Sequence, residues 1–188
     1  MSQRIRERLE DCPVIAAVRD EEGLRECLKT DCGIVFILYG DIMNIASVVE
    51  RVKEKKRLAM VHMDLIAGLG SREISVDFLY ETVRADGIIS TKPALVRRAG
   101  ELGMSTVMRF FVIDSMALEN IQRQCEQARP DCIEILPGVM PKVIRRIVRT
   151  VRQPVIAGGL LTDKEDVMAA LNAGAVSVST TNRELWYA

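Results

Sequence analysis

The sequence predicts a compact (β/α)8 barrel of the TIM type, with minimal loops and a truncated last helix. Short apolar segments alternate with amphipathic helical segments along the whole chain, a pattern typical of a parallel sheet with right-handed crossovers. Eight such strand–helix units can be distinguished, which is the number that closes as a barrel. The 188 residues are few for this fold, for which about 250 are typical, so the loops have to be short.

We expect residues 1–188 to form this barrel as one domain, because a chain of this length can bury a substantial core. A doubly wound open sheet is the alternative fold. It would normally carry a glycine-rich phosphate-binding fingerprint near the first strand. The chain has no such fingerprint there, which favours the barrel.

The first half of the chain predicts four strand–helix units after a basic N-terminal helix. Apolar runs bounded by Gly, Pro or Asp indicate strands, and apolar residues at a 3.6-residue period indicate helices. The strands are expected at Pro13–Val18, Gly33–Leu38, Leu58–Met63 and Gly87–Ile89. The helices are expected at Glu21–Lys29, Asn44–Lys55 and Val76–Val83, with a fourth beginning at Pro93.

The second half continues the alternation by the same criteria. Its strands are expected at Ser105–Phe111, Cys132–Leu136, Val155–Ala157 and Ala175–Val178. One helix runs from its cap at Asp114-Ser115 to Arg129, and the next is Pro141–Val151. A short charged helical run separates the last two strands, and the eighth helix is expected to be a stub at Asn182–Tyr187.

The composition predicts an ordinary globular protein. Lys and Arg total 26 and Asp and Glu total 26, so nucleic acid or a membrane could be attracted only by a local patch. The five cysteines lack metal-ligand or CxxC spacing, and we expect free thiols in a reducing compartment. No signal peptide or membrane-spanning run is present in the sequence, so we expect a cytoplasmic protein without a membrane partner.

Two strand ends near the C-terminus predict a phosphate site. Gly158 and Gly159 follow the seventh strand, Ser179 and Thr180 follow the eighth, and Asn182 is placed to cap the next helix. Glycines free backbone N–H groups, and the positive end of a helix dipole favours a dianion. Ordinary tight turns are the alternative, but the loops after strands seven and eight are where barrels frequently hold a phosphate.

Ionisable side chains at the strand ends predict a polar pocket at the same face. They are Arg19, His62, Asp64, Lys92, Arg109 and Glu134. A packed core tolerates so many charges only when they are paired or bind a ligand. Carboxylates accept hydrogen bonds from hydroxyl groups and arginines bind phosphate, so the implied ligand is a small phosphorylated polyol. His62, Asp64 or Lys92 could instead serve acid–base or Schiff-base catalysis. No metal cluster is evident, and we expect no cofactor.

Six segments in order resemble the glycerol-3-phosphate-responsive antiterminators of glycerol uptake operons. The segments are VHMDLIAGLG (61–70), ADGIISTKP (85–93), RFFVIDSMAL (109–118), EILPGVMPK (134–142), PVIAGGL (154–160) and AGAVSVSTTNRELW (173–186). The resemblance covers nearly the whole length, and several segments are longer than the geometry of a barrel requires.

The resemblance implies a regulator rather than an enzyme. Such proteins bind glycerol 3-phosphate and act on the leader mRNA of the glycerol operon, so that transcription passes a terminator. Matched segment by segment, it implies ligand contacts at Asp64, Lys92, Arg109, Glu134, Gly158, Gly159, Ser179 and Thr180. Arg19 is added as the basic residue expected at the end of the first strand.

The helix expected at Pro141–Val151 is the best candidate for RNA binding, because neutralised phosphates supply most of the affinity for nucleic acid. Its cations fall on one arc, opposite an apolar stripe: Lys142, Arg145, Arg146, Arg149 and Arg152. The alternative is a solvated amphipathic helix. Aromatic residues, at 4%, offer few stacking platforms, so readout would use backbone contacts and RNA shape, across two subunits if the protein is a homo-oligomer.

Two other functions stay open at this point. One is a barrel lyase, isomerase or transferase for a phosphorylated triose or polyol, with Lys92 or Asp64 as its working group. The other is a metabolite-binding barrel that recruits a protein instead of RNA. For the regulator, glycines at 68, 70 and 138 suggest that the ligand orders the loops after Asp64 and Glu134.

Overall fold

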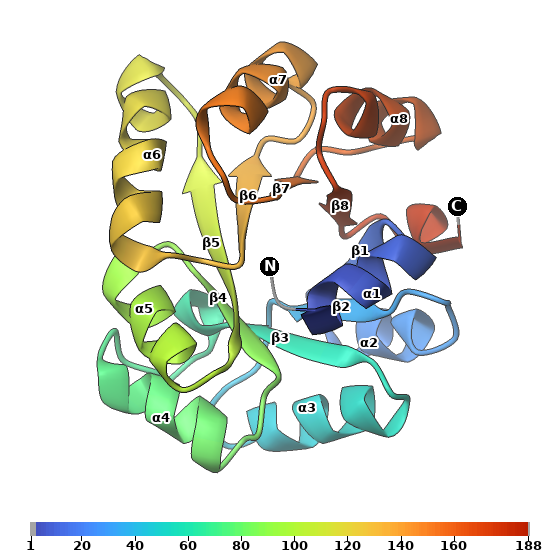
Figure 1. Cartoon of the computed structure of the whole chain (residues 1–188). Coiled ribbons are helices and arrows are strands. Elements are labelled where there is room, and N and C mark those ends of the chain that lie inside the picture. Colours follow the sequence, from blue (N-terminus) through green and yellow to red (C-terminus); the bar gives the residue numbers. More distant parts are fainter. Residues whose placement is uncertain (1–2, 188) are drawn as a thin grey trace.

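The computed structural model describes residues 3–187, which form a closed barrel of parallel strands and confirm the predicted fold (Figure 1). Each strand pairs with its neighbours in the sequence, and the last pairs with the first. The strands are β1 Val14–Val18, β2 Ile34–Ile37, β3 Leu58–His62, β4 Gly87–Ser90, β5 Ser105–Phe111, β6 Cys132–Leu136, β7 Val155–Gly158 and β8 Ser177–Thr180.

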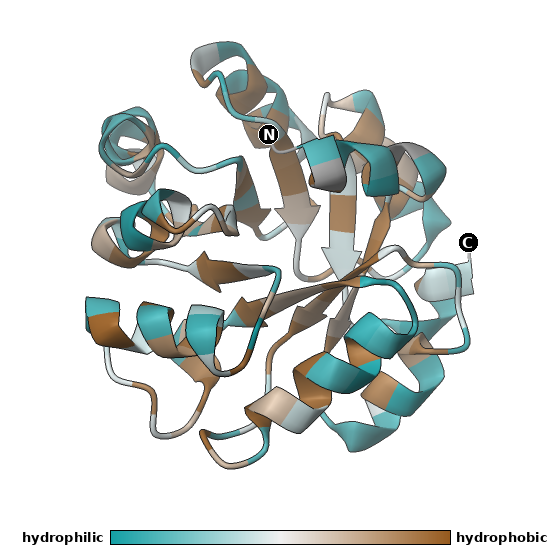
Figure 2. Cartoon of the chain, turned by 60° about the horizontal axis from the view of Figure 1, so that its bottom comes forward, coloured by the Kyte–Doolittle hydropathy of each residue, from teal (hydrophilic) through white to brown (hydrophobic). Residues whose placement is uncertain are grey.

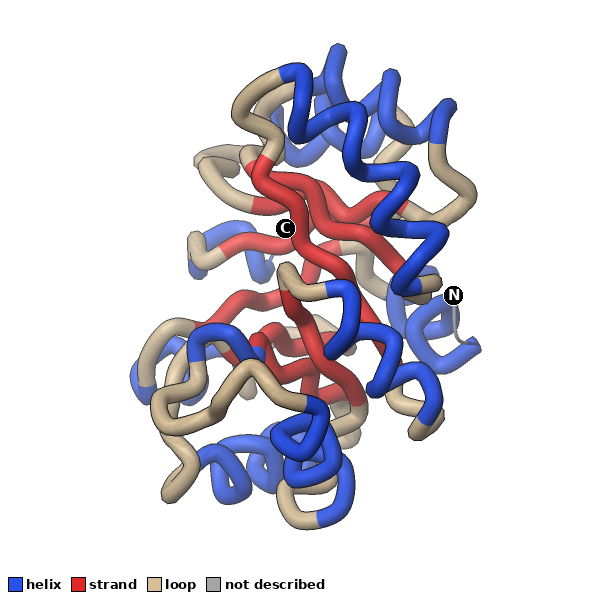
Figure 3. The backbone as a smooth tube through the Cα atoms, turned by 90° about the vertical axis from the view of Figure 1, so that its left-hand side faces the viewer, coloured by secondary structure: helices blue, strands red, loops and turns tan. Residues whose placement is uncertain are grey.

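Helices surround the barrel, and all but the first return the chain from the end of one strand to the start of the next (Figures 1 and 3). They are α1 Gln3–Asp11, α2 Glu21–Cys27, α3 Ile45–Glu54, α4 Glu73–Glu81, α5 Pro93–Glu101, α6 Ser115–Ala128, α7 Pro141–Thr150 and α8 Lys164–Asn172. Two 3₁₀ turns, η1 Met63–Leu65 and η2 Arg183–Tyr187, follow β3 and β8. The expected truncation of the last helix is therefore present as η2.

Aspartates begin several of these helices, which explains where the loops stop. Asp20 accepts a hydrogen bond from the backbone N–H of Gly23, and Asp114 and Asp163 cap α6 and α8 in the same way. Each cap satisfies one of the backbone donors that the first turn of a helix leaves free. Short capped connections keep the loops minimal, as the chain length requires.

The inside of the barrel is apolar at its N-terminal end and polar at its C-terminal end. Ile5 and Leu9 of α1 pack against the inward side chains of the strands, among them Phe36 and Met60, so α1 covers the N-terminal end. Figure 2 shows the hydrophobic colour concentrated on the strands, with polar residues on the helices. Burial of the strands on both faces explains their near-continuous apolar sequences.

Some boundaries differ from the sequence prediction. The last strand begins at Ser177 rather than Ala175, because the N–H of Ala175 still bonds to Ala170 of α8. The helix expected to reach Val151 ends at Thr150, and the backbone of Val151 is already extended. Arg152 therefore lies beyond α7, close to Pro154, a residue that disfavours helix before it.

Two further features concern the cysteines and the helix lengths. All five cysteines are free, and four of them are buried. Within residues 3–187, none of the helices combines the length and the apolar character needed to cross a membrane.

Candidate functional site

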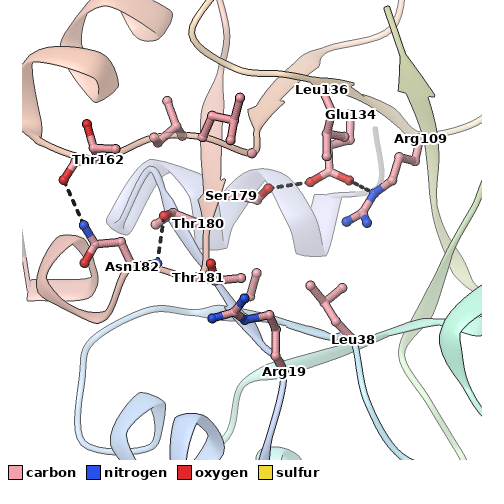
Figure 4. Close-up of a pocket in the computed structure, with 14 residues that line it drawn as sticks. Arg19, Leu38, Arg109, Glu134, Leu136, Thr162, Ser179, Thr180, Thr181 and Asn182 are labelled. Atoms are coloured by element: carbon pink, nitrogen blue, oxygen red, sulfur yellow. Dashed lines mark hydrogen bonds and ion pairs between the residues drawn. The ribbon is translucent and has the colours of Figure 1, made fainter.

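A cavity of about 400 Å³ opens at the C-terminal mouth of the barrel (Figure 4). Its walls come from the ends of β1, β2, β5, β6, β7 and β8 and from the loops that follow β7 and β8. The lining residues are Ala17, Arg19, Leu38, Arg109, Glu134, Leu136, Gly159, Leu160, Leu161, Thr162, Ser179, Thr180, Thr181 and Asn182. The structure thus brings together six of the nine predicted ligand-binding residues.

A buried ion pair occupies one wall of this cavity. Arg109 Nε donates to Glu134 Oε2 at 2.5 Å, and the hydroxyl of Ser179 donates to Glu134 Oε1. Arg109 is 7% exposed and Glu134 is fully buried, so neither charge is stabilised by bulk water. The two residues are register partners on β5 and β6, and this places their side chains side by side inside the barrel.

The cavity has an excess of positive charge. Its charged lining residues are Arg19, Arg109 and Glu134, and Glu134 already neutralises one arginine. The terminal nitrogens of Arg109 donate no hydrogen bond to any described residue, and Arg19 forms no ion pair among residues 3–187. Arginine side chains with unused donors at the rim of a cavity are suited to binding an anion such as phosphate.

The loop after β7 has an unusual backbone. Gly159 has φ +75°, and the next residue, Leu160, has φ +61° although it carries a side chain. Positive φ is uncommon for residues other than glycine, and such strained positions gather at ligand sites. Within the described part of the chain, the backbone N–H groups of Gly159 and Leu160 take part in no hydrogen bond. The loop therefore presents free donors beside the cavity.

Gly158 does not line the cavity, but its lack of a side chain is required behind the lining. A Cβ atom at this position would stand 2.5 Å from the hydroxyl oxygen of Ser179 and 2.6 Å from Glu134 Oε1. Both distances are too short for a real Cβ atom. The predicted Gly158-Gly159 pair therefore has two separate functions, space for the Glu134 carboxylate and a turn with positive φ.

The end of β8 is fixed by a set of local hydrogen bonds. The hydroxyl of Thr180 accepts from the N–H of Asn182 at 3.0 Å, and Asn182 Oδ1 accepts from the N–H of Glu184 at 3.1 Å. This is the capping role predicted for Asn182. Its Nδ2 also donates to the carbonyl of Thr162, which joins the loops after β7 and β8 (Figure 4). Trp186 Nε1 bonds to the carbonyl of Thr180.

Asp64 and Lys92 form a separate cluster at the ends of β3 and β4. Asp64 accepts from the N–H and hydroxyl of Thr91 and from the hydroxyl of Ser90, at 2.7 to 3.0 Å. Burial would raise the pKa of Asp64, but these hydrogen bonds outweigh it and hold the pKa below its usual value. Lys92 Nζ lies 3.8 Å from Asp64 Oδ1 and donates to the hydroxyl of Ser71. Neither residue lines the cavity.

His62 is a predicted pocket residue that is buried and does not line the cavity. Its side chain is 3% exposed, and its Nδ1 atom is buried without a hydrogen-bond partner in the described structure. Burial, followed by the charge of Arg109, lowers the pKa of His62 to about 4, so the ring is neutral at pH 7. A neutral imidazole can donate one hydrogen bond and accept another.

The cavity also has lining residues that sequence reasoning missed. Leu38, Leu160 and Thr181 line it although the sequence did not single them out as ligand contacts. A signal existed for Thr181, because it follows two predicted contacts in the run STT. No sequence signal marked the unusual backbone of Leu160, since its conformation is set by the loop rather than by residue type.

The cationic face predicted for RNA lies on α7 and just beyond it. Lys142, Arg145, Arg146 and Arg149 are exposed on the helix, while Ile144 and Ile147 are buried against the barrel. Arg152, also exposed, lies in the following loop. None of the five cations forms an ion pair with a described residue. Their charge is therefore available to a partner.

Comparisons with known proteins point to one family. The family model described as "Glycerol-3-phosphate responsive antiterminator" matches residues 14–186. The uncharacterized protein YgcP of Escherichia coli (strain K12) is 44% identical over 174 residues, which cover 93% of this chain and 91% of that protein.

Two solved structures agree with that match. The glycerol uptake operon antiterminator regulatory protein of Listeria monocytogenes str. 4b F2365 superposes with a TM-score of 0.90 at 30% identity, over 94% of this chain and 95% of that one. A glycerol uptake operon antiterminator-related protein of Thermotoga maritima MSB8 has a TM-score of 0.81 at 35% identity, over 92% and 96% of the two chains.

Proposed function

We propose, from the premise that this chain belongs to the family of glycerol-3-phosphate responsive antiterminators, that it is a cytoplasmic regulator of transcription termination. In this proposal glycerol 3-phosphate binds in the cavity at the mouth of the barrel. The liganded protein then binds the leader mRNA of glycerol metabolism genes and lets transcription pass a terminator.

The observation that carries the proposal is the combination of a phosphate-type loop with a polar wall in one cavity. The free N–H groups of Gly159 and Leu160, together with Arg19, suit the phosphate. Arg109 and Glu134 lie further into the barrel, where the hydroxyl groups would reach. Ser179 and Thr180, on β8, complete the proposed contacts.

Two of the three predicted contacts that do not line the cavity keep a different role in this proposal. Asp64 and Lys92 bind each other and residues of neighbouring loops, so they would act on the ligand only if the loop between β3 and α4 moved over the cavity. The same geometry gives no support to an enzyme that uses Lys92 as a Schiff-base residue or Asp64 as a base. Neither side chain lines the cavity at the mouth of the barrel.

RNA would bind to the cationic face of α7 in this proposal. The start of α7 is linked to the ligand loop, because the N–H of Gly138, before α7, donates to the carbonyl of Gly159 at 3.0 Å. A Cβ atom at Gly138 would stand 3.0 Å from the backbone nitrogen of Gly158, so the two loops pack backbone against backbone. A ligand that shifts Gly159 would therefore shift the segment that leads into α7.

Isothermal titration tests the ligand. We expect glycerol 3-phosphate to bind, glycerol and inorganic phosphate to bind much more weakly, and no turnover product to form. Arg19→Gln should weaken binding about tenfold or more, because it removes a charge-assisted hydrogen bond. Arg25→Gln is the matched control, since Arg25 is an exposed arginine on α2 outside the cavity. Equal affinities of the two variants would contradict the proposed site.

Gel-shift titrations with a glycerol operon leader transcript test the RNA surface. Replacing Arg145 and Arg149 together by Gln should weaken binding and lower the slope of log K against log salt by about 1.4, if two phosphate contacts to single-stranded RNA are lost. The double variant of Arg25 and Arg97 removes the same charge from α2 and α5 and serves as the control. If both double variants bind RNA as the native chain does, α7 is not the surface.

A further inference from the structure

The strand register places His62 in the same layer of the barrel interior as Arg109. His62 pairs with Ile89 of β4, and Ile89 pairs with the β5 residue two positions before Arg109. The step from His62 to Arg109 thus crosses two strands and advances two residues along the chain. The same step leads from Arg109 to Gly158, from Gly158 to Ala17, and from Ala17 back to His62. In this fold, four side chains from alternate strands form one such layer.

This layer is asymmetric in the size of its side chains. Gly158 has no side chain and Ala17 has only a methyl group, whereas His62 and Arg109 carry long polar groups. The cavity is lined by Ala17 and Arg109, which are the two neighbours of His62 around the layer. His62 itself is not among the lining residues, so its imidazole lies beside the wall of the cavity, between Ala17 and Arg109 in this layer.

The chemistry of the ring defines what it can bind. His62 is buried, and its Nδ1 atom has no hydrogen-bond partner among residues 3–187, an arrangement that native proteins tolerate rarely. The ring is neutral beside Arg109, so it can bind an uncharged polar group without a second charge being buried. A hydroxyl group fits whichever tautomer is present, because it can both donate and accept.

We infer that His62 binds a hydroxyl group at the end of the ligand opposite the phosphate, and that the site selects phosphorylated polyols by this contact. The inference rests on the proposed function, because it takes the phosphate to lie at the loop of Gly159. It assigns His62 a direct role in recognition, distinct from catalysis. It also predicts that inorganic phosphate alone is a poor effector.

Nitrogen NMR of the imidazole tests the inference without any substitution. The chain has one histidine, so ¹⁵N-histidine labelling gives a single pair of ring signals. We expect glycerol 3-phosphate to shift the Nδ1 signal, and n-propyl phosphate, which has no hydroxyl groups, to leave it in place. The backbone amide signals of Gly159 and Thr181 should respond to both compounds.

The outcomes separate this inference from the proposed function. If glycerol 3-phosphate shifts the two amide signals but not the imidazole signals, His62 does not bind the ligand and the inference is wrong. If none of these signals changes, the proposed effector itself is wrong, and the inference falls with it. A shift of the Nδ1 signal by n-propyl phosphate equal to that by glycerol 3-phosphate would also overturn the inference, since no hydroxyl group is then involved.

A set of variants measures the specificity. His62→Phe should lower the affinity for glycerol 3-phosphate at least tenfold and leave that for n-propyl phosphate unchanged. His62→Gln, which retains a donor and an acceptor, should recover part of the loss. Ile89→Val, a change in the neighbouring layer, is the control for interior repacking. A loss of affinity for both compounds alike in His62→Phe would show a structural role and contradict the inference.

Discussion

Glu134 lies between Arg109 and Ser179 and binds both, so that one fully buried carboxylate joins β5, β6 and β8. Arg109 and Glu134 are both buried and are register partners on neighbouring strands, unlike the exposed ion pairs on the outer helices. Removing one member of a buried pair leaves an uncompensated charge in a poorly solvated place. The wall of the cavity is therefore also a determinant of stability.

Glu134→Gln should lower the free energy of unfolding by about 3 kcal/mol, because Gln keeps the shape of Glu but leaves Arg109 without a counter-charge. Urea denaturation followed by circular dichroism measures the change. Glu101→Gln is the matched control: Glu101 pairs with Arg98 on the exposed surface of α5, and its loss should cost under about 1 kcal/mol. Equal losses for the two variants would show that the buried pair contributes no more than a surface pair.

Gly158→Ala should destabilise the protein and weaken ligand binding, because its Cβ would stand within 2.6 Å of both Ser179 Oγ and Glu134 Oε1. Overpacking of this kind costs about 1–3 kcal/mol. Gly100→Ala is the control, since no atom lies within 4 Å of a Cβ there and the residue is in α5. It should be neutral or stabilising by up to about 1 kcal/mol. Thermal unfolding and ligand titration of both variants provide the comparison.

The protein should lose stability as the pH falls from 6.5 to 4, because His62 takes up a proton more readily in the unfolded chain than in the folded chain. Its pKa is about 4 in the folded chain, because of burial and the charge of Arg109, against 6.5 in the unfolded chain. Between these values the unfolded chain binds the extra proton, so a falling pH favours unfolding. The contribution of His62 to the free energy of unfolding is fully present above pH 6.5, and about 3 kcal/mol of it is lost once the pH is below 4.

Comparison with His62→Gln isolates this contribution, since carboxylates titrate in the same range in both proteins. The difference in unfolding free energy between native chain and variant should shrink, or change sign, from pH 7 to pH 4. A difference that stays constant over this range would mean that His62 titrates normally in the folded state.

The fold was predictable from the sequence because its signals are local and repeated. Each strand is an apolar run and each helix has an amphipathic period, so eight repeats specify the barrel even where a boundary is displaced. Inward positions within strands, such as Arg109 and Glu134, were predictable for the same reason, since side chains alternate along a strand. The layer that includes His62 follows only from the strand register, which a single sequence does not contain.

Positions in loops were predicted less well. Asp64 follows its strand by two residues, and alternation suggested that it faces inward with His62. The chain turns into η1 after His62, and the carboxylate of Asp64 binds Thr91 instead of facing the cavity. Arg152 was placed on a helix by periodicity, but the chain leaves α7 before Pro154. In both cases the backbone changes direction at a point that periodicity does not register.

Gly138→Ala should uncouple RNA binding from the ligand, because its Cβ would press on the backbone of β7 at Gly158 and Ala157, 3.0 to 3.1 Å away. In the native chain, saturating glycerol 3-phosphate should raise RNA affinity by at least fivefold, and by linkage RNA should raise the affinity for glycerol 3-phosphate by the same factor. In the variant this factor should approach one. RNA affinity without ligand should be unchanged, since α7 keeps its cations.

Gly70→Ala distinguishes the two loops that could transmit the signal. Gly70 lies between β3 and α4, and the nearest atom to a Cβ there, the hydroxyl oxygen of Ser75, is 3.9 Å away. If the loop before α7 carries the coupling, glycerol 3-phosphate raises the RNA affinity of Gly70→Ala as much as that of the native chain, whereas Gly138→Ala loses this effect. If the loop after Asp64 must close over the ligand instead, the order of the two variants reverses. Gel-shift titrations with and without glycerol 3-phosphate decide between them, because the contact of Gly138 with Gly159 serves only the first route.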